Sequence, residues 1–76
     1  MNKILIEHSG TSYYNKVANE TQDLIEYVFG LDAEQMIGEE DGMMTLYVDG
    51  EPPIQIGEFS SVPNQETLRL FISIAT

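Results

Sequence analysis

The pattern of apolar and polar residues predicts one long amphipathic helix over residues 12–30. At 3.6 residues per turn, the apolar side chains of this stretch fall on one continuous stripe and the polar side chains on the opposite side. The stripe consists of Tyr14, Val17, Ala18, Thr21, Leu24, Ile25 and Val28. Thr11 or Ser12 can cap the start of the helix, and Gly30 can end it in a left-handed conformation.

A shorter helix is the alternative for this stretch. Asn19 can act as its cap, and Gln22, three residues later, would complete a capping box. The longer helix also accounts for the apolar residues that precede Asn19, and we therefore prefer it.

Three further stretches have the residue patterns of β-strands. Residues 3–8 are rich in β-branched residues, and three consecutive apolar residues indicate a strand in the middle of a sheet. Residues 43–48 alternate as a strand with one buried face does. Residues 53–59 form a third strand, whose start is expected at a sheet edge because Pro52 and Pro53 cannot donate ladder hydrogen bonds.

Residues 49–50, an Asp-Gly pair, mark a hairpin between the second and third of these strands. A three-residue loop of residues 48–50 would set Met44 opposite Ile54 and keep one face of the hairpin apolar. A two-residue loop would set Met44 opposite Gln55 instead. We therefore expect the three-residue loop, with its glycine left-handed.

The segment of residues 31–42 is ambiguous. Asp32 followed by Gln35 has the pattern of a cap, and it predicts a short helical turn that ends at Gly38. The acidic residues that follow predict an exposed turn.

The C-terminal residues 67–75 fit two patterns. A strand would place Leu68, Leu70, Ile72 and Ile74 on one face. A helix would place only Arg69 and Ser73 outside, with Glu66 near its N-terminus, where the helix dipole favours a negative charge. The strict alternation and the β-branched residues favour the strand, and the helix is the alternative.

These elements predict an α+β fold in one small two-layer domain over residues 1–76, with the order β-α-β-β-β. One amphipathic helix would pack on a mainly antiparallel four-stranded sheet. Such a sheet leaves one face to solvent, and an exposed apolar sheet face is usually a contact surface. We therefore expect a homodimer, or a tight complex with another protein, through the sheet. The apolar residues available to its two faces include Ile4, Leu5, Ile6, Met43, Met44, Tyr47, Phe59 and Phe71.

The charge of the chain is extreme, because 13 acidic residues face three basic ones and give a net charge of −10. This balance argues against direct binding to nucleic acid or anionic lipid, since both require a basic surface. It favours a partner with a basic surface instead. In composition alone, a short acidic chain without a catalytic signature resembles the small decoy and inhibitor proteins that phages encode.

The composition also excludes several classes of protein. With no cysteines, disulfides and thiolate metal sites are excluded. No apolar run of about 18 residues is present, as a membrane span would require, and the N-terminus lacks the apolar region of a signal peptide. We therefore expect a cytoplasmic protein.

Two acidic groups are the candidate partner-binding residues. On the predicted helix, Glu20, Asp23 and Glu26 recur every third residue, which places successive carboxylates about 4.5 Å apart along the axis. Such a row can be an ordinary solvated helix surface, or it can imitate the phosphates of a nucleic acid strand. The acidic turn adds Glu39, Glu40 and Asp41. Tyr13 and Tyr27 lie at the margin of the helix, and aromatic residues are enriched at protein interfaces.

A polar cluster, residues 8–12, is the candidate ligand site. It follows a strand and opens a helix, where free amides and the positive end of the dipole can hold an anion. The candidate ligand-binding residues are His8, Ser9, Thr11 and Ser12. The simpler interpretation gives the hydroxyls turn and capping roles and leaves His8 exposed at the end of the strand.

No pattern in the sequence supports catalysis or a resident metal. A single histidine excludes a histidine-rich zinc site. Asp32 and Glu34 begin a calcium-loop pattern, but Met36 occupies the third ligand position and Ile37 the place of the loop glycine. Because no set of nucleophile, base and orienting group can be assembled, we expect a protein that is not an enzyme and needs no cofactor.

The sequence therefore predicts a non-catalytic acidic binding or inhibitor protein that acts on a basic partner. A nucleic-acid-handling protein is the partner class with a suitable basic face. The alternative is a small homo-oligomeric module with a ligand site at residues 8–12.

Overall fold

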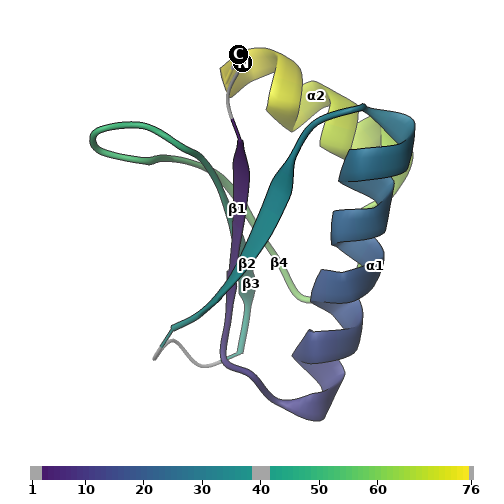
Figure 1. The fold of residues 1–76 in the computed structure, drawn as a ribbon. Helices are drawn as coiled ribbons and strands as arrows, with labels where there is room; N and C mark the ends of the chain where they lie inside the picture. The colour runs from purple at the N-terminus through teal and green to yellow at the C-terminus, as the bar shows by residue number, and fades with distance from the viewer. Residues whose placement is uncertain (1–2, 39–41, 76) are drawn as a thin grey trace.

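The computed structural model describes residues 3–38 and 42–75, with side chains as far as Ser73. In chain order the elements are β1 (Ile4–His8), α1 (Ser12–Val28), β2 (Ala33–Ile37), β3 (Met44–Val48), β4 (Ile54–Phe59) and α2 (Gln65–Ala75). The strands form a four-stranded mixed sheet in the order β2-β1-β3-β4, and both helices lie on one side of it (Figure 1). The α+β class is confirmed, whereas the predicted order with a single helix is wrong.

β1 lies inside the sheet, as its run of apolar residues predicted. It pairs in parallel with β2 and antiparallel with β3. Ile4 and Ile6 are completely buried on the side of the helices, and Leu5 is buried on the opposite side. Successive side chains of a strand point to opposite faces, so the two isoleucines fix the orientation of the whole strand.

α1 begins and ends as its sequence predicts. The hydroxyl of Thr11 accepts a hydrogen bond from the backbone N–H of Tyr14 at 3.3 Å and so caps the helix. Gly30 follows the helix with a φ of +67°, the left-handed conformation that glycine adopts without strain. The buried residues of α1 are Tyr14, Val17, Ala18, Thr21 and Ile25. Val28 is exposed, so the apolar stripe ends one turn earlier than predicted.

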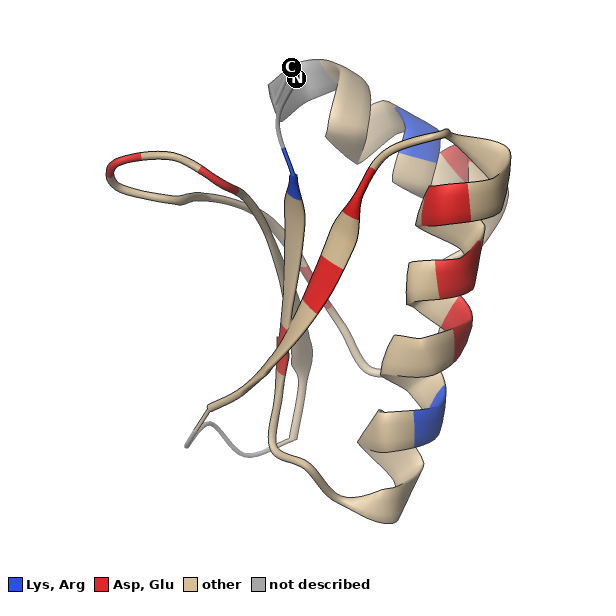
Figure 2. Ribbon diagram, in the orientation of Figure 1, with Lys and Arg blue, Asp and Glu red and all other residues tan. Residues whose placement is uncertain are grey.

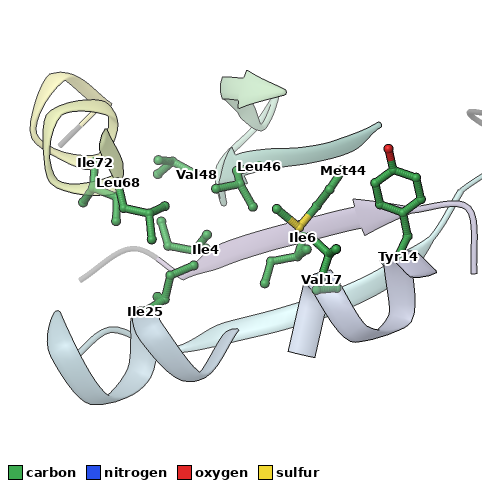
Figure 3. Close-up of a cluster of buried hydrophobic side chains, with 11 residues drawn as sticks. Ile4, Ile6, Tyr14, Val17, Ile25, Met44, Leu46, Val48, Leu68 and Ile72 are labelled. Atoms are coloured by element: carbon green, nitrogen blue, oxygen red, sulfur yellow. The ribbon is translucent and has the colours of Figure 1, made fainter. Parts of the chain in front are cut away.

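The hydrophobic core lies between the sheet and the two helices. Figure 3 shows Val17 and Ile25 of α1 directed toward Ile4 and Ile6 of β1. Leu46 and Val48 of β3 and Leu68 and Ile72 of α2 complete this cluster. Burial of each such side chain contributes roughly 1.5–3 kcal/mol, and this packing holds the helices on one face.

β2 replaces the short helical turn that we predicted for residues 32–38, and that prediction is wrong. Ile4 of β1 pairs with Ala33, and His8 pairs with Ile37. The backbone N–H of Ile4 donates to the carbonyl of Asp32, and that of Gly38 donates to the carbonyl of His8. Five residues are too few for a stable isolated helix. Because α1 returns the chain beside β1, these residues instead form ladder hydrogen bonds with the free edge of that strand.

The hairpin between β3 and β4 is longer than the predicted three-residue loop. Val48 pairs with Ile54, so the loop comprises residues 49–53. A bulge follows, because Leu46 pairs with Gly57 and Tyr47 with Gln55. The predicted register is therefore wrong. Two prolines that cannot donate hydrogen bonds delay the start of pairing, and the bulge restores the apolar face later in the strand. The predicted edge position of β4 is confirmed.

α2 is a helix, so the strand that we preferred for residues 67–75 is wrong and the alternative is correct. Asn64 caps this helix, since its side-chain oxygen accepts from the backbone N–H of Thr67 at 2.8 Å. Leu68 and Ile72, four residues apart, are buried against the end of the sheet, while Leu70 is 65% exposed. A strand would have placed all three side chains on one face. The helix instead turns Leu68 and Ile72 toward the end of the core and Leu70 toward solvent.

The difference between Leu68 and Leu70 predicts unequal losses of stability. Leu68→Ala should lower the free energy of unfolding by about 2–5 kcal/mol, because it creates a cavity in the core. Leu70→Ala, in the same helix, should change it by less than about 0.5 kcal/mol. Urea unfolding measures both, and equal losses would indicate the strand instead.

Candidate functional site

The carboxylates of Glu20, Asp23 and Glu26 form a row on the outer surface of α1, where all three residues are exposed. Figure 2 shows the acidic positions of this helix on the side away from the sheet. Within residues 3–38 and 42–75, none of the three takes part in a salt bridge or a side-chain hydrogen bond. We call this group the helix row. Its charges are therefore available to a partner.

Tyrosines lie at both ends of α1, but their surroundings differ. Tyr27 is 84% exposed and lies one turn after Asp23, beside the helix row. Tyr13 is also exposed, but its hydroxyl donates to the backbone carbonyl of Ser60 at 2.7 Å and links α1 to the end of β4. Tyr27 is therefore the aromatic side chain better placed to contact a partner.

The second acidic group predicted from the sequence, Glu39, Glu40 and Asp41, lies outside the described residues. The helix row is the described part of the predicted acidic surface.

The candidate ligand site at residues 8–12 is largely occupied by the protein's own hydrogen bonds. His8 is 1% exposed, so the expectation of an exposed histidine is wrong. Its Nδ1 accepts from the backbone N–H of Gly10 at 3.1 Å, and its Nε2 lies 3.1 Å from Oε1 of Gln35. The neutral ring therefore carries its proton on Nε2 and donates it to Gln35.

The other three residues of this predicted site do not converge with His8 on a common point. Thr11 caps α1, Ser9 is half-buried in the turn, and Ser12 is the exposed first residue of the helix. The capping and turn roles of the hydroxyls are therefore the ones that this geometry favours.

Sequence reasoning missed a polar network that joins β1, β2 and α1. Gln35 accepts from His8 and donates through Nε2 to Asn19 and Gln22, each at 2.7 Å. Gln22 in turn donates to the backbone carbonyl of Ala33 at 2.8 Å. The prediction of a helical turn hid this network, because only a strand brings Gln35 beside His8. Residues 33–37, Ala-Glu-Gln-Met-Ile, do not alternate between apolar and polar positions, so their pattern did not predict a strand.

The sheet face opposite the helices, which we call the open face, carries a small pocket. Its lining residues are Leu5, Glu7, Met36, Tyr47 and Pro53, and its volume is about 210 Å³. Most of the lining is apolar, and Glu7 provides its one ionisable carboxylate. We call it the central pocket, because β1 forms its floor between β2 and β3. This pocket could not be predicted from the sequence, since its residues come from four separate segments.

The carboxylate of Glu7 is held in a defined position in the central pocket. One oxygen, Oε1, accepts from the hydroxyl of Tyr47 at 3.3 Å. The other, Oε2, lies against Gly38, where an added Cβ would come within 2.7 Å of it. Glycine at this position therefore leaves room for the carboxylate.

Two further polar groups of the open face bear on Glu7. Lys3, which the strand's alternation places on the same face, forms a salt bridge with Glu34 at 2.9 Å. The hydrogen bond to Glu34, together with that carboxylate's charge, raises the pKa of Lys3 above its ordinary value. Thr45, opposite Glu7 in register, is buried, and its hydroxyl has no hydrogen-bond partner among the described residues. Within that part of the chain, Glu7 therefore has no cationic partner.

Neither a metal centre nor a membrane span is found in residues 3–38 and 42–75. No three His, Cys, Asp or Glu side chains of these residues are grouped in a way that could hold a metal ion. Neither α1 nor α2 has the length and apolar character needed to cross a bilayer.

Comparison with known proteins gives no relative. No family model matches the chain, and no curated protein or solved structure is significantly similar to it. Function must therefore be argued from the surface and the pocket themselves.

The network around His8 predicts a loss of stability when Gln35 is replaced. Gln35→Leu removes the acceptor for a buried imidazole and should lower the free energy of unfolding by about 1–3 kcal/mol. Gln55→Leu, the same change at an exposed position of the other edge strand, should stay within about 0.5 kcal/mol. Both are measured by urea unfolding. Similar values for the two variants would mean that the network contributes nothing.

Proposed function

We propose that this protein is a non-catalytic binding protein that occupies the basic surface of another protein through its acidic face. The observation that carries the proposal is the helix row, three exposed carboxylates without an intramolecular partner in the described residues. The net charge of −10 also favours a partner with a basic surface. A nucleic-acid-handling protein is the partner class that we propose, because it presents a basic surface that such a row can cover.

The electrostatics of the helix row favour recognition at long range. The three carboxylates face solvent, so their field is screened over about 8–10 Å at ordinary salt concentrations. Complementary charges of this kind accelerate association and exclude partners of the same sign more than they add affinity. Exposed Tyr27 offers the neighbouring contact area that a stable complex also needs.

The alternative function, a ligand site at residues 8–12, has less support from the geometry. A ligand there would have to replace the hydrogen bond from Gly10 or the one to Gln35, because both ring nitrogens of His8 are in use. Breaking a hydrogen bond of a buried group without replacing it costs about 1–3 kcal/mol. The binding free energy of any ligand at this site would be reduced by the same amount.

Charge reversal of the helix row tests the proposal. In a pull-down from a lysate of the source cells, basic proteins should be captured at about 50 mM salt and largely released at about 500 mM. A variant with Glu20→Lys, Asp23→Lys and Glu26→Lys should lose this capture. The control variant with Asp49→Lys, Glu51→Lys and Glu66→Lys changes the net charge equally at exposed positions elsewhere and should lose much less.

Two results would contradict the proposal. One is that the captured proteins have no basic surface. The other is that the two variants, shown by circular dichroism to be folded, lose capture to the same extent.

A further inference from the structure

We propose that the central pocket binds the side chain of an arginine that the basic partner inserts into the open face. This inference rests on the proposed function, because it names the group of the partner that the acidic protein would recognise. It is carried by different residues from those of the helix row, on the opposite layer of the molecule.

The size and lining of the pocket fit one long side chain. Small-molecule sites usually have volumes of roughly 300–1,000 Å³, whereas the central pocket has about 210 Å³. Leu5, Met36 and Pro53 provide apolar surface for an aliphatic stem, and the ring of Tyr47 provides an aromatic wall. Guanidinium groups pack on aromatic rings and are more weakly hydrated than ammonium groups, so an arginine suits this lining.

The charge at the pocket selects a cation. Glu7 places a carboxylate among these apolar residues, and its Oε2 has no hydrogen-bond partner in the described residues. Lys3, on the same face, is engaged by Glu34, so Glu7 has no cationic partner among the described residues. A carboxylate of this kind is stabilised by a charge-assisted hydrogen bond from a guanidinium, which carries five donors.

A second copy of the chain fits the open face less well. The register of the strands places Glu7, Glu34 and Glu58 on this face, where Lys3 is the one cation among the described residues. A twofold interface would bring the same residues of both copies together, and like charges directly opposed cost affinity. The homodimer expected from the sequence is therefore the competing occupant in the test.

The test uses N-acetyl-arginine N-methylamide as the probe and N-acetyl-citrulline N-methylamide, its neutral isostere, as the control ligand. The arginine probe should bind with a Kd on the order of 1 mM. In NMR titrations it should shift the signals of Leu5, Glu7, Met36 and Tyr47. The citrulline probe should bind at least roughly tenfold more weakly, because it lacks the charge.

Three variants separate the role of Glu7 from general charge and from folding. Glu7→Gln keeps an oxygen that can accept from Tyr47 and should weaken the arginine probe roughly tenfold without lowering the free energy of unfolding. Glu58→Gln makes the same change on the same face outside the pocket and should have less than a twofold effect. Gly38→Ala retains the charge but displaces the carboxylate, and it should weaken binding as Glu7→Gln does.

Several outcomes would overturn the inference. They are equal binding of the two probes, equal effects of Glu7→Gln and Glu58→Gln, shifts confined to α1, or a concentration-dependent dimer that covers the pocket residues. If the arginine probe fails while the helix-row reversal still abolishes capture of basic proteins, the inference fails and the proposed function stands. If the probe binds the pocket but no basic protein is captured, the proposed function fails by itself.

Discussion

The burial of Ile4 and Ile6 against α1 is the interaction on which the rest of the structure depends. These side chains are completely buried, and they determine which face of β1 the helices cover. Because side chains alternate along a strand, Leu5 and Glu7 must then lie on the open face. The same packing turns the polar side of α1 to solvent. Both candidate surfaces, the helix row and the central pocket, follow from this one constraint.

The sequence predicted the elements whose local signals agree with their tertiary roles. α1 has an apolar stripe, a cap at Thr11 and a glycine at its end, and its prediction was correct to within two residues. The short elements were harder, because their residues fit two patterns. Leu68, Leu70 and Ile72 alternate like a strand, and only the space left at the end of the core makes the helix the better solution. The exposure of Leu70 cannot be read from spacing alone.

The two candidate sites also differ in whether the sequence alone could predict them. The helix row could be predicted, because its three acidic residues recur at every third position of one predicted helix. The central pocket could not, since it depends on the parallel pairing of β2 with β1 and on a hairpin register set by a bulge. Glu7 is an isolated acid in an apolar strand when the sequence is read in order. Its pocket appears once Met36, Tyr47 and Pro53 are brought around it by the fold.

The two surfaces would contribute differently to binding a basic partner. The helix row is solvent-exposed, so it would steer the encounter with a basic partner, and this effect would fall with salt. A partly enclosed carboxylate is screened less, so binding of an arginine in the central pocket, on the opposite layer, would depend less on salt. Zero-length carbodiimide cross-linking, which joins carboxylates to amines in direct contact, tests the central claim most directly. The account predicts bonds from Glu20, Asp23 or Glu26 to lysines of the captured partner, identified by mass spectrometry. Bonds formed solely from acids outside the helix row, such as Glu51 or Glu66, would contradict it.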